Sequence, residues 1–418
     1  MLYQSVLKGG ELPVWLILLV IGLVFPPIVS CCLSLYFFLR YKQTNYLIPF
    51  AFYFVLFLTY NFFSIDNLGR FRRATRFISE DWYLGDPLTN LMRVGMQWAD
   101  LQCSFFFFLY ILAVYVLFLK TLEHCTMQAK DWPFFVIFVT TLSFRNSMDL
   151  LYYCLSVVFG VWFITRKDTL TLFNFCLLIP LTYLLHPGFL IILLPALGLY
   201  WAIKQDLNGN MRIYYWALLG IFVFYWILSR VGSIPLMGVP VIDSVTMMFK
   251  SYTSVGYWGI RTSSISGISY TIMYYIVPLI YFFIFLVSLR YRAITRQPLV
   301  LAIFQTALLM YPNFINYVTL TERTLLVLSI TSVLTLLMLV DTKKINLTIQ
   351  HIVLYCVLIF LFTSFKGTGA VQLRNVFRAG SYQEIRNRSY FLPSFMLLDY
   401  KNYGYSDSFL KENRHITY

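Results

Sequence analysis

Residues 101–119 read LQCSFFFFLYILAVYVLFL, a run of nineteen positions without a charged side chain. A helix needs about 20 consecutive apolar residues to span the ~30 Å hydrocarbon core of a bilayer. This run therefore predicts a transmembrane helix, and it is one of many in the chain.

Apolar runs of this kind recur along the whole sequence. Twelve are predicted to be spans, at residues 13–39, 46–63, 101–119, 132–143, 148–164, 169–185, 189–203, 213–229, 269–289, 298–316, 324–340 and 347–365. Of the 418 residues, 59% are apolar and 12% are charged, whereas soluble domains carry about 25% charged residues. This composition excludes a soluble enzyme, a secreted disulfide scaffold and a disordered protein. We expect an all-α, polytopic integral membrane protein.

Two of the predicted spans are irregular. The fourth, at 132–143, is short, so we expect it to be tilted or re-entrant. In the first, Pro26 and Pro27 are expected to kink the helix, with neighbouring groups satisfying the carbonyls that the prolines leave without a donor. This first run has no basic region before it and is followed by more spans, so we do not expect a removable signal peptide.

Basic residues are distributed unequally between the two sets of alternate loops. The set at 40–45, 120–131, 165–168, 204–212, 290–297 and 341–346 holds 13 Lys and Arg in 45 positions, and the other set holds 19 in 155. The positive-inside rule places the first set in the cytoplasm. We therefore attribute the net charge of +14 to membrane orientation rather than to nucleic-acid binding.

This orientation predicts a helical bundle at residues 1–365 with large loops, 64–100 and 230–268, on the outer face. Both termini lie on the same face. Residues 366–418 form an extracytoplasmic tail that is rich in Tyr, Arg and Asn and can pack across the outer mouth of the bundle.

Motifs of soluble active sites are missing. We find no GxxxxGK[ST], GxGxxG, HExxH or GxSxG pattern, so the sequence gives no support for nucleotide-driven pumping, zinc hydrolysis or an α/β-hydrolase site. The four histidines are too dispersed to predict a metal site, and we expect no cofactor. The seven cysteines form no CxxC motif and lie mostly in apolar runs, which is typical of packing residues.

The outer loop 64–100 is biased toward arginine. It contains five arginines and no lysine, namely Arg70, Arg72, Arg73, Arg76 and Arg93. The guanidinium group binds phosphate oxygens in pairs, which favours an anion-binding role. Glu80-Asp81-Trp82-Tyr83 lies in the same loop. The alternative is a solvated loop with internal ion pairs.

Three short outer turns carry further polar residues. Arg145 lies in the turn 144–147, where it can face an aqueous cavity or simply pair with Asp149 one helical turn later. His186 precedes Pro187 and Gly188, where it can cap a helix, accept a proton or donate to a phosphate. Arg323 precedes the eleventh predicted span, where it can bind an anion or extend toward lipid head groups.

The shortness of these turns holds Arg145, His186 and Arg323 near the outer boundary of the membrane, and the arginine-rich loop can fold over them. An anionic ligand at the outer leaflet is therefore expected. The head of a lipid-linked diphosphate lies at this depth.

In these features the sequence resembles the EpsG/Wzy-type polysaccharide polymerases over roughly residues 1–340. The matching segments are Arg40-Tyr41-Lys42, Asp81-Trp82-Tyr83, Arg145-Asn146-Ser147-Met148-Asp149, His186-Pro187-Gly188-Phe189 and Arg323. The chain departs from the family pattern in three places: Asn146 stands for the usual Gln, Asp149 for a small residue, and Glu80 for Thr.

The resemblance implies a GT-C-like, metal-independent glycosyltransferase of the bacterial inner membrane whose active site faces the periplasm. Such enzymes polymerise repeat units carried on undecaprenyl diphosphate. The growing chain moves from its lipid diphosphate to the non-reducing end of another lipid-linked unit. The implied partners are this lipid-linked oligosaccharide, membrane lipids and a separate chain-length-regulating membrane protein.

This chemistry suggests roles for the polar residues. Asp81, Glu80 or His186 would take the proton of the acceptor hydroxyl. The diphosphate would be bound by arginines, namely Arg145, Arg323, Arg73, Arg70 and Arg76. Trp82 and Tyr83 would stack on sugar rings, although aromatic residues also gather at membrane interfaces for packing alone.

Two other classes of function stay open. One is a transporter or lipid flippase, but such proteins often carry charges in the middle of their spans, and here these are nearly absent. The other is a different GT-C transferase, such as an O-antigen ligase, which the sequence does not separate from a polymerase.

Overall fold

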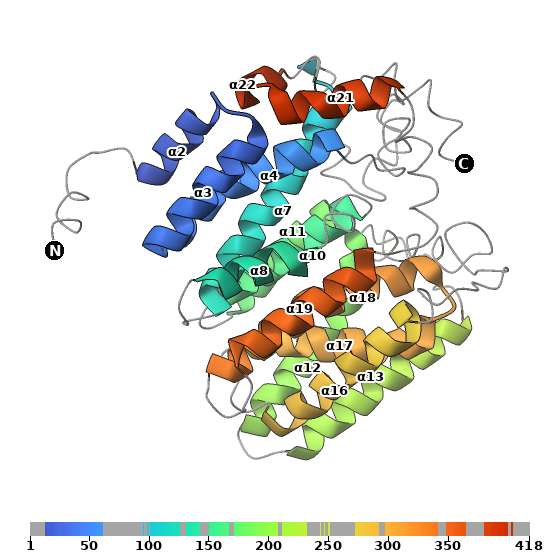
Figure 1. Cartoon of the computed structure of the whole chain (residues 1–418). Coiled ribbons are helices and arrows are strands. Elements are labelled where there is room, and N and C mark those ends of the chain that lie inside the picture. Colours follow the sequence, from blue (N-terminus) through green and yellow to red (C-terminus); the bar gives the residue numbers. More distant parts are fainter. Residues whose placement is uncertain are drawn as a thin grey trace.

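The computed structural model describes residues 13–61, 95, 98–99, 101–125, 131–142, 150–166, 171–207, 211–231, 243, 246, 250, 272–291, 297–341, 348–364, 380–399 and 403. The elements in these ranges are helices: α2 (Val14–Gly22), α3 (Pro27–Tyr41), η2 (Thr44–Tyr46), α4 (Leu47–Asn61), α7 (Cys103–Cys125), α8 (Trp132–Thr141), α10 (Leu151–Thr165), α11 (Leu172–Leu185), η3 (Pro187–Phe189), α12 (Leu190–Leu207), α13 (Met211–Val231), η4 (Ile272–Ile276), α16 (Val277–Tyr291), α17 (Pro298–Phe314), α18 (Val318–Asp341), α19 (Ile349–Ser364), α21 (Gly380–Phe391) and α22 (Ser394–Leu397). Figure 1 shows them packed as one bundle. The predicted all-α class is confirmed for this part of the chain.

Within the described ranges, four helices are long and apolar enough to cross a membrane. Their apolar segments are Phe105–Cys125, Pro187–Gln205, Met211–Arg230 and Thr319–Val340, with mean hydropathy between 1.5 and 2.2. The other predicted spans coincide with shorter helices, and the predicted fourth span is α8, with 10 residues. These helices support a membrane protein, and the number of crossings stays a prediction.

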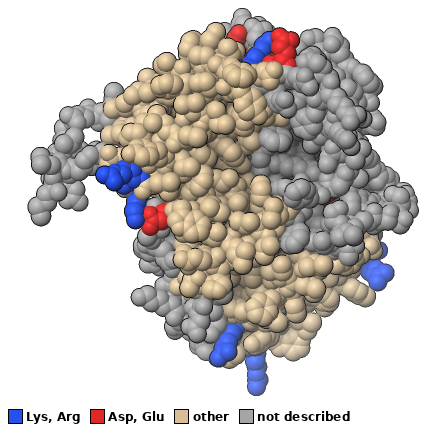
Figure 2. All heavy atoms as spheres, viewed as in Figure 1, with Lys and Arg blue, Asp and Glu red and all other residues tan. Residues whose placement is uncertain are grey.

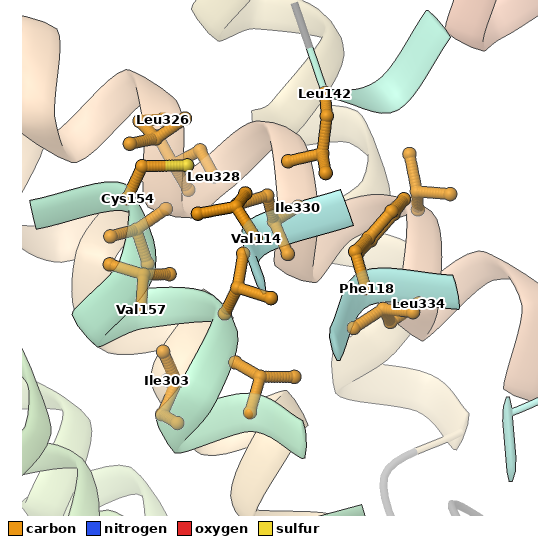
Figure 3. Close-up of a cluster of buried hydrophobic side chains, with 14 of the residues drawn as sticks. Val114, Phe118, Leu142, Cys154, Val157, Ile303, Leu326, Leu328, Ile330 and Leu334 are labelled. Carbon is orange, nitrogen blue, oxygen red and sulfur yellow. The ribbon is translucent and has the colours of Figure 1, made fainter. Parts of the chain in front are cut away.

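The centre of the bundle is α18, which contacts α7, α8, α10, α16, α17 and α19. Figure 3 shows how side chains from α7, α10, α17 and α18 meet there, among them Val114, Cys154, Ile303 and Leu328. These four side chains are fully buried. Apolar packing therefore fills this part of the bundle.

We expected the first predicted span to be one helix kinked at Pro26 and Pro27. This prediction is wrong, because the structure has two separate helices there. The backbone is broken before Pro27, and the Ser30 hydroxyl donates to the carbonyl of Gly22 at 2.6 Å, so the chain folds back on itself. α2 and α3 therefore lie side by side (Figure 1). Two successive prolines remove two backbone donors, which prevents a continuous helix.

The C-terminal segment closes this break. The backbone N–H groups of Ser394 and Phe395 donate to the carbonyls of Phe25 and Leu23 at 2.9 and 3.0 Å. The carbonyl of Leu23, to which Pro27 has no N–H to donate, is in this way satisfied by a segment about 370 residues away in the sequence.

The same segment is fixed to the end of α4. The Asn61 side chain donates to Ser389 Oγ at 2.8 Å, and Tyr60 donates to the Leu397 carbonyl at 2.7 Å. Tyr403 is fully buried, and its hydroxyl lies 2.8 Å from that of Thr59. Figure 1 shows α21 and α22 lying across the ends of α3, α4 and α7. In its described part, the tail packs across one end of the bundle.

The opposite ends of the helices are joined by polar contacts between loops predicted to be cytoplasmic. Lys42 pairs with Asp131 at 2.9 Å, and Lys120 donates to Asn45 at 3.1 Å. Figure 2 shows the charged side chains at the edges of one face of the molecule, with a broad uncharged surface between them. This distribution is the one expected of a surface that faces hydrocarbon.

Candidate functional site

His186 lies at the junction between α11 and α12. α11 ends at Leu185 because Pro187 favours an extended conformation in the residue before it, and His186 has φ −168° and ψ 112°. Pro187 then begins η3, at a position where a missing N–H is tolerated. This turn buries His186, whose exposed fraction is only 4%.

Hydrogen bonds on both sides fix His186 in place. Its N–H donates to the Thr182 carbonyl at 2.9 Å, and its carbonyl accepts from Ser156 Oγ at 3.4 Å. Its ring Nδ1 accepts from the Gly188 N–H at 3.0 Å, which makes His186 the N-cap of η3. The expectation that this histidine can cap a helix is confirmed.

Glycine is required at position 188 because the His186 ring lies very close to it. A Cβ atom at position 188 would lie 2.7 Å from Cε1 of His186 and 2.9 Å from its Nδ1. Contacts this short force something to move, so glycine allows the ring to stay over the turn.

Arg323 approaches the histidine from α18. The sequence predicted that it precedes a helix, but α18 begins at Val318, so Arg323 lies in the second turn. Its Nη1 atom is 3.2 Å from Nε2 of His186, although 137 positions separate the two residues. The structure thus brings together two of the predicted site residues.

The two contacts of the imidazole ring involve different nitrogen atoms, Nδ1 and Nε2. A neutral histidine has one nitrogen that donates and one that accepts. In the neutral tautomer whose Nδ1 accepts from the Gly188 N–H, the proton is on Nε2. Nε2–H then faces another donor, the Arg323 guanidinium. In this tautomer both groups carry N–H bonds that can donate to one anion lying beside the pair.

Tyr153, on α10, is a member of the site that the sequence did not single out. Its ring centroid lies 5.1 Å from Cζ of Arg323 and 5.4 Å from the centroid of His186. With 32 tyrosines in the chain, nothing in the sequence distinguishes this one. The site therefore combines one side chain each from α10, the α11–η3 turn and α18.

Glu322 is the neighbour of Arg323 on α18, but its side chain contacts a different element. Its carboxylate accepts from the Tyr274 hydroxyl of η4 at 3.4 Å. Residues one position apart on a helix do not share a face. The carboxylate thus contacts η4, whereas Arg323 contacts the α11–η3 turn.

The remaining predicted site residues lie outside the part of the chain that the structure describes. They are Arg70, Arg73, Arg76, Glu80, Asp81, Trp82, Tyr83 and Arg145. Their roles stay predictions. Among the described residues, no group of three or more His, Cys, Asp and Glu side chains is placed to hold a metal ion.

Comparisons of the chain with family models, with curated proteins and with solved structures find no match. What can be inferred about function therefore rests on the residues of this chain and on the geometry described above.

Proposed function

We propose that the protein is a polysaccharide polymerase that acts on lipid-linked repeat units. It would transfer the growing glycan from undecaprenyl diphosphate to the non-reducing end of another undecaprenyl-diphosphate-linked unit, without a metal or another cofactor. The observation that carries this proposal is the pairing of His186 with Arg323, 3.2 Å apart at the ends of their helices.

The pairing supports a diphosphate ligand for an electrostatic reason. A guanidinium group and an Nε2–H group can donate to oxygens of one phosphate, and charge-assisted hydrogen bonds of this kind are strong. His186 is almost fully buried, so competition from water is reduced at this end of the site. Arg145 lies eight positions before Tyr153 in the sequence and is proposed as a further cation for the same ligand.

In the proposed reaction the acceptor hydroxyl oxygen attacks the anomeric carbon of the donor glycan. The bond between that carbon and the diphosphate oxygen breaks, and undecaprenyl diphosphate leaves with the bonding electrons. Arg323 and His186 would stabilise the negative charge that develops on the leaving group. In the tautomer whose Nδ1 accepts from the Gly188 N–H, His186 would donate from Nε2 and would not be the base. Asp81 or Glu80 is the proposed base.

An apolar groove also supports a lipid-linked substrate. It has a volume of about 460 Å³, lies between α12 and α13, and is lined by apolar residues such as Leu199, Trp201 and Phe224. α12 begins directly after η3, so one helix leads from His186 to the groove. A hydrocarbon chain attached to a diphosphate at His186 can follow this path.

The finer architecture belongs to the same proposal. We infer a GT-C-like bundle with twelve crossings in a bacterial inner membrane, with the end that carries His186 facing the periplasm. The loop contacts at the opposite end agree with this orientation, since they join loops rich in Lys and Arg. A topology reporter fused after Tyr418 would read outside. A reporter that reads inside would contradict the orientation.

The test is the gel ladder of surface polysaccharide in a strain that lacks the gene. Polymerase function predicts that only single repeat units remain, and that the wild-type gene restores the ladder. Loss of all repeat units from the outer face would instead indicate a flippase or transporter. Long chains that stay on the lipid carrier would indicate a ligase.

Substitutions at His186 separate its two roles in this assay. Asn at position 186 can still accept from the Gly188 N–H, because asparagine is a good N-cap residue, but it lacks the Nε2–H group. We expect His186→Asn to keep the protein folded and to lose the ladder. A full ladder from this variant would remove His186 from the proposed site.

A further inference from the structure

Tyr153 has contacts that suggest a defined task in the site. It lies near the start of α10, is 2% exposed, and its ring touches both Arg323 and His186. The guanidinium lies over the ring at 5.1 Å, within the range of a cation–π interaction. The imidazole meets the same ring edge to face, with an interplanar angle of 85°.

The cation–π contact draws the Arg323 guanidinium toward the Tyr153 ring, beside the imidazole that packs on the same ring. The face of an aromatic ring is electron-rich and attracts a cation. Tyr153 supplies this attraction from a third helix.

The ring is itself held in place by its surroundings. Phe189 packs at right angles to it, with centroids 6.3 Å apart. Phe189 in turn lies against Gly160 on α10, where an added Cβ atom would be only 2.9 Å from the phenylalanine ring. Tyr153 is therefore seated between α10 and η3, and the position of its face is determined by packing.

We propose that Tyr153 is a positioning residue that holds the Arg323 guanidinium beside His186 before the anion binds. This inference rests on the proposed function, because the anion is taken to be the diphosphate of the lipid-linked substrate. The ring face performs the task, and the hydroxyl is not needed for it. Holding the donors in place in advance lowers the cost of ordering them on binding.

Three variants on α10 test the proposal. Tyr153→Phe keeps the ring face, Tyr153→Leu removes it, and Tyr152→Leu removes the neighbouring buried tyrosine, whose ring packs on Tyr110 instead. The probe is undecaprenyl diphosphate added to the purified full-length protein in detergent. Its dissociation constant is measured for each variant, with thermal unfolding as a check on folding.

We expect Tyr153→Leu to weaken binding about tenfold, and Tyr153→Phe and Tyr152→Leu to stay within about twofold of the wild type. If the Leu variant unfolds at a lower temperature, Tyr153→Met fills the space with an unbranched chain and replaces it in the comparison. Tight binding by both the Leu and Met variants would overturn the proposal. Equal losses from Tyr152→Leu and Tyr153→Leu would also overturn it, since they would indicate only a packing role.

A double-mutant cycle distinguishes positioning from direct binding. If Tyr153 acts through Arg323, Tyr153→Leu has no further effect on binding once Arg323→Ala is present. Additive losses would contradict the proposed task. Failure of the wild-type protein to bind undecaprenyl diphosphate would instead refute the proposed function and leave the contacts of Tyr153 unexplained.

Discussion

α18 and α13 are both predicted spans, of similar length and both strongly apolar, yet one is buried in the structure and the other is exposed. The apolar window of α18 has a mean hydropathy of 2.1 and is 94% buried, whereas that of α13 has 1.5 and is 22% buried. α18 forms the centre of the bundle, and α13 lies at its surface. Hydropathy therefore finds helices that can enter a membrane but does not tell which of them protein surrounds.

The type of side chain does separate the two helices. α18 carries small hydroxyl residues that are buried, namely Thr319, Thr321, Thr324, Ser329, Thr331, Ser332 and Thr335. α13 instead exposes large aromatic residues, namely Tyr215, Trp216, Phe222, Phe224 and Trp226. Small polar residues allow close helix packing and hydrogen bonds between helices in a membrane, and large aromatic residues are suited to a lipid surface.

The largest expected difference between the two helices concerns catalysis. Arg323 on α18 faces His186, whereas Arg230 at the end of α13 is exposed. Since loss of one donor to a developing negative charge costs roughly 10²–10³ in rate, Arg323→Ala should lower the polymerisation rate by about that factor. Arg230→Ala should stay within about twofold, because an exposed cation at this depth is solvated. Rates of chain growth with purified protein measure both.

Equal rates for the two arginine variants would contradict a local role of Arg323 at His186. The charge would then act only through the general electrostatic field of the surface. A further variant, Arg323→Lys, tests whether the shape of the guanidinium group matters. Lysine keeps the charge but not the planar fork, so Arg323→Lys should recover only part of the rate.

The next difference concerns stability. Leu328 on α18 is fully buried, and Leu219 on α13 is 49% exposed. Leu328→Ala leaves a cavity and should lower the free energy of unfolding by about 2–5 kcal/mol. Leu219→Ala should change it by no more than about 0.5 kcal/mol, as at other surface positions. Unfolding in detergent, followed by helical circular dichroism, compares them, and similar losses would mean that α13 is covered by protein.

The smallest difference concerns single hydroxyl groups. The hydroxyl of Ser332 on α18 lies 2.6 Å from that of Tyr355 on α19, while Ser229 on α13 donates to Trp226 within its own helix. Side-chain hydrogen bonds between membrane helices contribute about 0.6 kcal/mol on average. Ser332→Ala should therefore lower stability by about that amount, and Ser229→Ala should have no measurable effect. The reverse order would show that the contact between α18 and α19 is not stabilising.

Much of the fold was predictable because apolar runs correspond closely to the helices. The main error fell on residues 13–39, where two successive prolines were expected to bend a helix. The chain reverses there instead, because the C-terminal residues Ser394 and Phe395 bond to the carbonyls of the break. A contact between opposite ends of the sequence cannot be found from a local pattern.

The site was predictable residue by residue but not as an arrangement. His186 and Arg323 were indicated by the short turns and by the free-energy cost of placing a charge near the membrane. The cap formed by His186 follows from the Pro-Gly that comes after it. Arg323 was expected in a turn because the apolar run of the eleventh predicted span begins after it, yet Glu322 and Arg323 both lie on α18, where they face different neighbours. Tyr153 was missed because its role depends on the packing of α10 against two distant segments.

The central claim is that Arg323 and His186 bind the diphosphate of a lipid-linked repeat unit during polymerisation. The most direct measurement uses purified protein with a synthetic undecaprenyl-diphosphate oligosaccharide as the only substrate, and follows chain length and released undecaprenyl diphosphate together. The account predicts that the wild type forms a ladder with one carrier released per bond, that Arg323→Ala and His186→Asn do not, and that Arg230→Ala does. A full ladder from Arg323→Ala, or none from the wild type, would contradict it.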